Sequence, residues 1–136
     1  MFEEYNIDLT GKNVVILGRS NIVGKPLIHC CLNKNATVTS CHSKQQNLAQ
    51  KQRSRYIDIS NRKSNFVTAD MVKDGAVVID VGINRLNNGK ITGDVDFESV
   101  KEKVSYITPV PGGVGPMTIA MLMNNVIKAT RRQNEW

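Results

Sequence analysis

The residues best placed to do chemistry form a short segment in which a buried-strand pattern ends at a glycine. Residues 14–17 are four apolar residues in a row, which is typical of a strand covered on both faces in a parallel sheet. Gly18 follows directly, and Gly24 stands where a helix would begin to pack on that sheet. Backbone N–H groups and the positive end of the helix dipole would then face one spot that a phosphate can approach. The segment therefore predicts an anion-binding turn, with an ordinary strand–turn–helix connection as the alternative.

The segment is not the full dinucleotide-binding fingerprint G-x-G-x-x-G, because Ser20 stands where the second glycine would be. Dinucleotide domains that prefer NAD usually carry an acidic residue about 20 residues past the glycine turn, where it binds the ribose 2′-hydroxyl. Residues 40–44 occupy that place here and read Ser-Cys-His-Ser-Lys, without a carboxylate.

Arg19, His42 and Lys44 instead offer an arginine fork, an imidazole and an ammonium, which suit a 2′-phosphate. We therefore expect the cofactor to be NADP rather than NAD. The alternative, that these are exposed polar side chains and His42 is an ordinary turn residue, stays open at this point. No metal-binding role is expected for His42, since no second ligand has a suitable spacing.

These residues need a framework of alternating strands and helices to bring them together. Strand patterns are expected at residues 13–17, 36–41, 76–82 and 105–108, and helices at 23–32, after Thr68, after Asp96 and from about Met117. This alternation predicts an α/β fold, a doubly wound Rossmann-like domain with a mostly parallel sheet. The residues that follow strands should meet at the carboxyl ends of the sheet; they are Gly18, His42, Ser43, Gly82 and Ile83.

Residues 109–116 read Pro-Val-Pro-Gly-Gly-Val-Gly-Pro and are too rich in proline and glycine for a regular element. They form either a rigid connector or a second wall of the ligand cleft, because glycines let the backbone approach a planar substrate closely. Both interpretations remain open from the residues alone.

Composition sets the class of protein. The 136 residues, 40% hydrophobic and 22% charged, predict one globular domain spanning residues 1–136, with no membrane span or signal peptide. Three cysteines without C-x-x-C spacing favour small core thiols in a reducing compartment, and we expect a cytoplasmic protein. The net charge of +6 suggests an anionic partner, and the excess comes mainly from residues 51–63 and from Arg131 and Arg132. A nucleic-acid binder is therefore a further alternative, but the pattern is unspecific, and neither nucleic acid nor membrane is expected as a partner.

Several longer motifs converge on one family. They lie at residues 11–26 (Gly-Lys-Asn-Val-Val-Ile-Leu-Gly-Arg-Ser-Asn-Ile-Val-Gly-Lys-Pro), 41–43 (Cys-His-Ser), 78–84 (Val-Ile-Asp-Val-Gly-Ile-Asn), 92–95 (Thr-Gly-Asp-Val) and 109–118. With these motifs the chain resembles the methylenetetrahydrofolate dehydrogenase/methenyltetrahydrofolate cyclohydrolase family, the FolD type, over nearly its whole length. The resemblance implies NADP-linked hydride transfer from 5,10-methylenetetrahydrofolate, followed by hydrolysis of the methenyl product to 10-formyltetrahydrofolate.

The resemblance also implies roles for individual residues. Gly18, Arg19 and Ser20 are expected to bind the cofactor, Ser43 to lie near its 2′-phosphate and Ile83 to contact the nicotinamide side. The residues expected to border the folate are Pro111, Gly112, Gly113, Val114, Gly115, Pro116, Met117, Thr118 and Ile119. The implied partners are tetrahydrofolate derivatives and, in full-length members, a second copy in a homodimer.

Members of this family carry a folate domain ahead of the nucleotide domain, with a Tyr-x-x-x-Lys pair whose lysine is the catalytic acid/base. After Tyr5 the chain continues through Ile7, Asp8 and Leu9, so Leu9 stands where the motif would have its lysine. The chain is therefore expected to lack that domain and any catalytic residue of its own. Because the protein must supply the proton-handling group, we expect NADP binding with little or no folate turnover. The alternative is a non-catalytic NADP-binding or interaction module left by truncation.

Residues 51–64 depart from the family pattern. The family has a strand and turn resembling Ala-Asp-Ile-Leu-Ile-Ser-Ala-x-Gly-Lys-Pro, whereas Asp58 here falls in mid-strand and Arg62 replaces the glycine that faces the cofactor. A one-base shift of suitably chosen codons for residues 55–63 gives Asp-Ile-Leu-Ile-Ser-Ala-Thr-Gly. The hypothesis is a local frameshift, which the nucleotide sequence of the gene would test. The alternative is a divergent segment with weaker cofactor binding.

Overall fold

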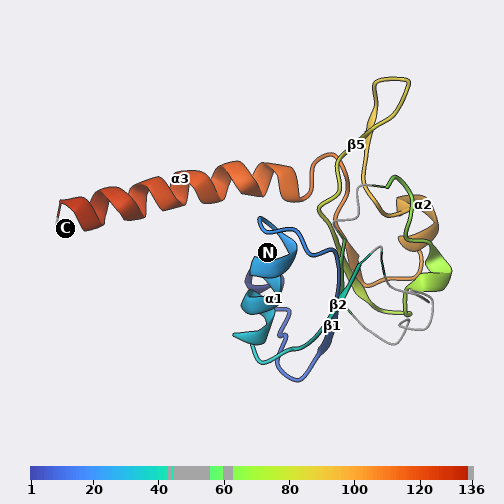
Figure 1. The fold of residues 1–136 in the computed structure, drawn as a ribbon, viewed down its shortest axis with the longest axis horizontal. Helices are drawn as coiled ribbons and strands as arrows, with labels where there is room; N and C mark the ends of the chain where they lie inside the picture. The colour runs from blue at the N-terminus through green and yellow to red at the C-terminus, as the bar shows by residue number, and fades with distance from the viewer. Residues whose placement is uncertain (43, 45–55, 60–62, 135–136) are drawn as a thin grey trace.

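The computed structural model describes residues 1–42, 44, 56–59 and 63–134. Five parallel strands form one sheet in the order β2-β1-β3-β4-β7, comprising β2(Thr37–Cys41), β1(Asn13–Leu17), β3(Tyr56–Ile59), β4(Val77–Asp80) and β7(Tyr106–Ile107) (Figure 1). The chain runs outward from β1 to β2 and then returns to the other side of β1 at β3. The predicted doubly wound α/β fold is confirmed.

The sheet is covered on both faces, which explains the unbroken apolar run in β1. Val15 and Leu17 belong to a core cluster with Val67 and Val100, whereas Val14 and Ile16 belong to a second cluster with Leu9, Cys31 and Ala36. Alternate residues of a strand point to opposite faces, so each β1 side chain enters one of the two cores. Figure 1 shows α1(Gly24–Leu32) and α2(Phe97–Val100) on opposite sides of the sheet.

Helix α1 packs through the residues expected to face the sheet. Cys31 is buried, and Leu27 and Ile28 are partly buried against the same core. Cys41 is also buried, but the prediction that all three thiols are core residues is wrong for Cys30, which is exposed. Neighbouring helical residues lie about 100° apart around the axis, so burying Cys31 turns Cys30 toward solvent.

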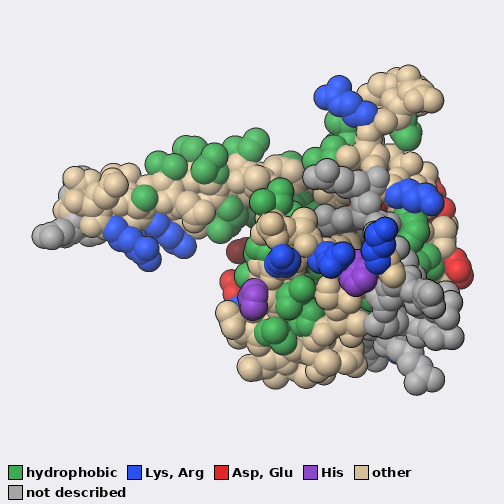
Figure 2. Space-filling model, in the orientation of Figure 1, with side chains coloured by type: hydrophobic (Ala, Val, Ile, Leu, Met, Phe, Trp, Pro, Cys, Tyr) green, Lys and Arg blue, Asp and Glu red, His purple; other side chains and the backbone are tan. Residues whose placement is uncertain are grey.

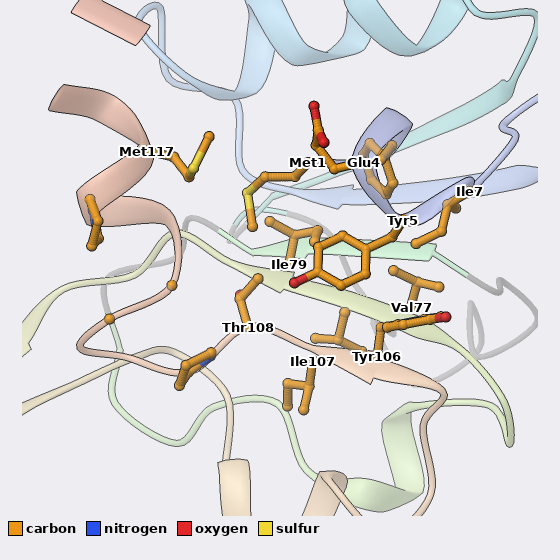
Figure 3. A pocket seen from close by; sticks show the side chains of 16 residues that line it. Met1, Glu4, Tyr5, Ile7, Val77, Ile79, Tyr106, Ile107, Thr108 and Met117 are labelled. Carbon is orange, nitrogen blue, oxygen red and sulfur yellow. The ribbon is translucent and has the colours of Figure 1, made fainter. Parts of the chain in front are cut away.

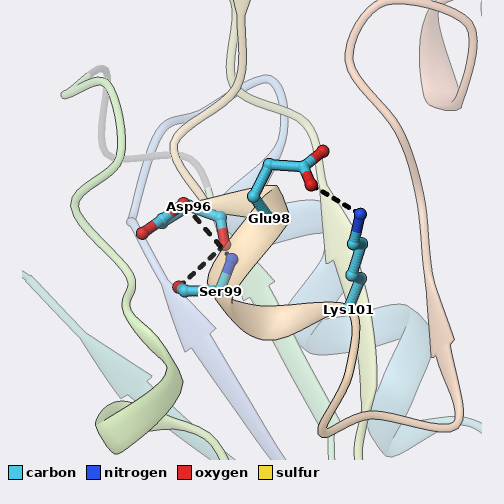
Figure 4. Close-up of polar contacts among 4 residues, drawn as sticks. All are labelled: Asp96, Glu98, Ser99 and Lys101. Atoms are coloured by element: carbon cyan, nitrogen blue, oxygen red, sulfur yellow. Dashed lines mark hydrogen bonds and ion pairs between the residues drawn. The ribbon is translucent and has the colours of Figure 1, made fainter.

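Short elements flank the sheet. η1(Glu3–Tyr5), at the start of the chain, lies beside α1, and its Glu3 forms an ion pair with Lys34 at 2.7 Å. η3(Ala69–Met71) connects β3 to β4, and the antiparallel hairpin of β5(Asn84–Arg85) and β6(Ile91–Thr92) lies between β4 and β7. Asp96 caps α2 by accepting the Ser99 N–H at 3.5 Å, and Lys101 forms an ion pair with Glu98 on the helix surface (Figure 4). The predicted helix start after Asp96 is therefore confirmed.

Helix α3(Val114–Gln133) projects away from the sheet (Figure 1). The predictions of a helix start near Met117 and of a wholly irregular segment at 109–116 are both wrong, since the helix begins at Val114 and includes Gly115 and Pro116. Proline is tolerated there because the first-turn N–H groups have no intrahelical partner. Residues 118–134 are all exposed. None of the helices in the described part of the chain has both the length and the apolarity needed to cross a bilayer.

The atypical segment contributes the central strand. Tyr56–Ile59 forms β3, with Asp58 in register with Ile16 of β1 and Ile79 of β4. Residues 51–55 and 60–62, including Arg62, lie outside the described residues. The choice between frameshift and divergence therefore stays a question for the gene sequence.

Candidate cofactor site

The turn after β1 lies beside the end of β2. Gly18 has φ +146° and donates its N–H to the Cys41 carbonyl at 2.9 Å. A Cβ on Gly24 would lie 2.6 Å from the carbonyl oxygen of Gly18. The first glycine is required by backbone conformation and the second by the close approach of α1 to the turn. Arg19, in the turn after β1, and His42, just after β2, consequently follow neighbouring strands of the sheet.

Ser20 stabilises the start of α1. Its Oγ accepts the N–H groups of Val23 at 3.1 Å and Gly24 at 3.2 Å, and its carbonyl oxygen accepts the Lys25 N–H at 3.0 Å. The sequence suggested that these amides face an anion, but in the structure they are already bonded within the turn. A serine at the second glycine position therefore replaces the ligand as the partner of the helix N-terminus.

His42 carries the clearest sign that this edge of the sheet takes a ligand. Its Nδ1 is buried and has no hydrogen-bond partner among the residues that the structure describes. A buried polar atom without a partner destabilises the fold, so a bound group that supplies one would be favoured. Arg19 and Lys44 are both exposed nearby in the chain, and Figure 2 shows lysine and arginine side chains on the same face as the two histidines. Ser43 lies outside the described residues.

These observations fit an anionic nucleotide. The Gly18–Gly24 contact forms a tight turn. The His42 Nδ1, which no described residue contacts by a hydrogen bond, lies at the end of the adjacent strand, and the exposed Arg19 and Lys44 are close in the chain. No carboxylate occurs in residues 18–25 or 40–44 to compete for those donors. The predicted cofactor residues Gly18, Arg19, Ser20 and His42 are thus brought to the ends of β1 and β2.

Ile83 lies farther along the same edge, after β4. Its side chain is 69% exposed although its neighbours Gly82 and Val81 are buried and half-buried. β4 is two strand positions from β1, which corresponds to about 10 Å at the usual strand spacing. A large apolar side chain exposed at this distance from the Gly18 turn can contact the far half of an extended dinucleotide.

Sequence reasoning missed two buried carboxylates beside Ile83. Asp80 and Asp94 are 3% and 0% exposed. Asp80 accepts N–H groups of Gly82 at 2.8 Å and Val95 at 2.9 Å. Burial raises the pKa of Asp80, the Asp94 charge adds to the rise, and the backbone N–H bonds oppose it. The sequence did contain a signal for these buried aspartates: an aspartate lies within two residues of a glycine both in Asp-Val-Gly (80–82) and in Gly-Asp-Val (93–95).

The residues expected to border the folate lie mostly around the start of α3. Pro111 and Gly112 precede the helix, Gly113 is its N-cap, and Val114, Gly115, Pro116, Met117, Thr118 and Ile119 form its first turns. Gly112, Gly113, Pro116 and Met117 help to line a largely apolar cavity of about 470 Å³, together with the N-terminal segment and residues along β4 and β7 (Figure 3). β7 lies three strand positions from β1, about 14 Å, so this set forms a region separate from the Gly18 turn.

A parallel doubly wound sheet with a glycine turn after β1 and a basic, carboxylate-free end of β2 defines a Rossmann-type nucleotide-binding domain. The chain belongs to the family described as tetrahydrofolate dehydrogenase/cyclohydrolase, NAD(P)-binding domain, which matches residues 1–134. The resemblance inferred from the motifs is therefore confirmed.

Relatives and solved structures agree on this family. The chain is 60% identical over 134 residues to the bifunctional protein FolD of Campylobacter hominis and 56% identical over 133 residues to that of Bacillus subtilis, covering 98% and 97% of this chain and 47% of each relative. The crystal structure of FolD from Campylobacter jejuni matches with a TM-score of 0.95 and 53% identity, over 97% of this chain and 47% of that one.

A FolD from Trypanosoma brucei, in complex with NADP and an inhibitor, matches with a TM-score of 0.92 and 35% identity, over 99% of this chain and 48% of that one. The chain thus spans about half the length of the curated relatives it matches.

Proposed function

We propose that this chain binds NADP along the carboxyl ends of β2, β1 and β4, as the nucleotide-binding half of a methylenetetrahydrofolate dehydrogenase/methenyltetrahydrofolate cyclohydrolase. The observation that carries the proposal is the buried Nδ1 of His42 next to the Gly18 turn, which finds no hydrogen-bond partner within the described part of the chain. Bound NADP would accept the hydride from the folate substrate. The protein must supply the pocket that binds the folate and the group that handles the proton.

The basic groups determine the choice between NADP and NAD. In this proposal Arg19, His42 and Ser43 bind the 2′-phosphate of the adenosine ribose, with Lys44 adding charge. A guanidinium binds a phosphate through two parallel hydrogen bonds, which is stronger than a contact with a neutral hydroxyl. A carboxylate after β2, which would favour the free 2′-hydroxyl of NAD, is absent from residues 40–44. The relative from Trypanosoma brucei is complexed with NADP, which supports the same choice.

Ile83 and the start of α3 supply the substrate side of the site. Ile83 offers an exposed apolar surface for the nicotinamide half of the cofactor. Residues 111–119 border the folate, and four of them line the cavity of about 470 Å³ shown in Figure 3. Gly112 and Gly113 both line that cavity, and a Cβ on Gly113 would lie 2.5 Å from the Pro109 carbonyl oxygen, so the turn before α3 has no room for a side chain there. A flat pteridine ring is the class of ligand that such a glycine-lined wall accommodates.

Folate turnover requires a second half that these residues do not contain. The family's acid/base lysine follows a Tyr-x-x-x-Lys pattern, and none of the three tyrosines in the sequence has a lysine four residues later. The chain also covers 47% of its relatives. We infer that residues 1–136 bind the cofactor and that hydride transfer and hydrolysis require a folate domain, in a protein that acts in the cytoplasm as a homodimer.

The test is a fluorescence titration of the 136-residue chain with NADPH, NADH and 2′,5′-ADP, the adenosine part of NADP. We expect saturable NADPH binding, at least tenfold weaker NADH binding, and competition by 2′,5′-ADP. Arg19→Ala should bring the NADPH and NADH affinities closer together, because a charge-assisted phosphate contact of about 1.5–3 kcal/mol is lost. Lys90→Ala, in the β5–β6 hairpin, is a matched control for the loss of one positive charge. Tighter binding of NADH than of NADPH would overturn the proposal.

Catalysis is tested separately. Dehydrogenase activity should be near background for the chain alone and should appear when a FolD folate domain is joined ahead of Met1. A joined protein that binds NADP yet shows no turnover would instead support the non-catalytic module.

A further inference from the structure

Two buried aspartates connect the segments that surround Ile83. Asp80, the last residue of β4, accepts backbone N–H groups from Gly82 at 2.8 Å, Asp94 at 3.2 Å and Val95 at 2.9 Å. Its own N–H donates to Oγ1 of Thr108, just beyond β7, at 2.8 Å. One carboxylate thus joins the end of β4, the turn after it, the segment after β6 and the end of β7.

Asp94 extends this connection in the other direction. Its Oδ1 accepts the side-chain amide of Asn84 at 2.7 Å and the backbone N–H of Lys63 at 3.0 Å. Asn84 also donates to the Gly93 carbonyl at 3.1 Å. We call Asp80, Asp94 and Asn84 the aspartate network. It ties the loop after β3 to the same turn that Asp80 holds.

The glycines next to the network are explained by these carboxylates. A Cβ on Gly82 would lie 2.5 Å from Cγ of Asp94, and a Cβ on Gly93 would overlap Oδ2 of Asp80. Both glycines therefore make room for the aspartates, and the turn is shaped around them. Two carboxylates buried side by side are unfavourable unless their hydrogen bonds compensate, so a turn that needed only to reverse the chain would not require them.

Ile83 is the residue that this network holds from both sides. Gly82 before it is bonded to Asp80, and Asn84 after it is bonded to Asp94. Ile83 itself is 69% exposed, at the carboxyl end of β4. A dinucleotide in a doubly wound domain extends across the carboxyl ends of the strands, so its adenosine half lies at β1 and β2 and its other half toward β3 and β4.

We propose that Asp80 and Asp94 are positioning residues, which fix Ile83 as a rigid apolar wall against the nicotinamide half of the dinucleotide. The inference rests on the proposed NADP binding. It assigns to the two aspartates no contact with the cofactor or the substrate. Their effect reaches the ligand only through the main chain at Gly82 and Asn84.

The test compares a ligand that has the nicotinamide half with one that lacks it. Asp80→Asn keeps the shape of the side chain but turns an amide donor toward backbone N–H groups. We expect it to weaken NADPH binding at least tenfold while 2′,5′-ADP binds within twofold of wild type. Asp74→Asn, at a surface carboxylate that is 90% exposed, should change neither affinity. Equal weakening of both ligands would show a general structural role and overturn the inference, as would no weakening of either.

A double-variant cycle keeps the inference testable if Asp80→Asn folds poorly. Asn84→Ala removes only the bonds of one amide, and Ile83→Ala shortens an exposed side chain. If the network acts through Ile83, Ile83→Ala should reduce NADPH affinity several-fold in wild type but less than twofold in the Asn84→Ala background. Additive losses would overturn the inference. A wild-type chain that binds neither NADPH nor 2′,5′-ADP would overturn the proposed function itself. The two failures can be distinguished, because this one is measured on wild type alone, whereas the inference is tested by comparing variants with wild type.

Discussion

Gly24 packs directly against Gly18, with space for no side chain between them. A Cβ on Gly24 would lie 2.6 Å from the carbonyl oxygen and 2.8 Å from the carbonyl carbon of Gly18. The first turn of α1 therefore rests on the backbone that ends β1. The distance between the helix and the strand, and with it the shape of the turn that carries Arg19, depends on this contact.

Gly24→Ala should disrupt this contact. The clash is with backbone rather than with a flexible side chain, so either α1 or the Gly18 turn must move, at a cost of about 1–3 kcal/mol of stability. The measurement is urea unfolding together with NADPH titration, and both should show a loss. Gly115→Ala is a suitable stability control, because its added Cβ would meet nothing within 4 Å in a helical turn. An unchanged midpoint for Gly24→Ala would contradict the packing described.

Ser20 should separate stability from cofactor affinity. Ser20→Ala removes the acceptor for the N–H groups of Val23 and Gly24 and should cost about 1 kcal/mol of stability. Ser20→Asp restores an acceptor at the helix N-terminus but adds a negative charge beside the proposed phosphate site. We expect Ser20→Asp to unfold close to the wild-type urea midpoint while its NADPH affinity falls more than that of Ser20→Ala. The reverse order of affinities would argue against an anion at this turn.

The parts of the fold that could be predicted are those marked by a pattern of consecutive residues in the sequence. An unbroken apolar run with glycine at its end predicts β1 and its turn, and the bounds expected for that strand are those of β1, Asn13–Leu17. The bonding of Ser20 to α1 was not predictable, because a serine after a strand fits either a cap or a ligand contact. The aspartate network depends on bonds from Asp80 to residues 14 and 15 positions later, which no local pattern encodes.

The titration of Asp80 should be visible in stability. Burial raises the pKa of Asp80 in the folded chain, so the folded protein keeps a proton over a pH range in which the unfolded chain has lost it. Stability should then fall as pH rises from about 3.9, the ordinary aspartate value, through the raised folded value. Asp80→Asn lacks this titration. The difference in free energy of unfolding between wild type and Asp80→Asn should therefore shrink with rising pH across that range. A difference that grows instead would contradict the prediction.

Asp58 gives a test of the atypical strand. It lies on β3, between Ile16 of β1 and Ile79 of β4, in a sheet with a core cluster on each face. Central parallel strands favour apolar residues, since both faces are covered. Asp58→Leu should therefore raise the midpoint of thermal unfolding by several degrees, as expected for about 1 kcal/mol or more. Asp74→Leu, at an exposed turn, should give no comparable gain. A lower midpoint for Asp58→Leu would show that the carboxylate is accommodated.

Helix α3 should make the isolated chain associate. Ile119, Leu122, Met123, Val126 and Ile127 recur on one side of the helix and are 51–67% exposed. Figure 2 shows hydrophobic side chains along this projecting helix, and contiguous exposed apolar side chains of this kind often mark a protein–protein contact. Sedimentation of the 136-residue chain should therefore show concentration-dependent self-association.

Leu122→Lys should abolish this association by placing a charge within the apolar face. Asn124→Lys adds the same charge on the opposite side of the helix and should leave the association intact. Joining a FolD folate domain should also reduce the association if the added half covers the apolar face of α3. An isolated wild-type chain that sediments as a monomer at every concentration would show that the exposed face of α3 is tolerated in water.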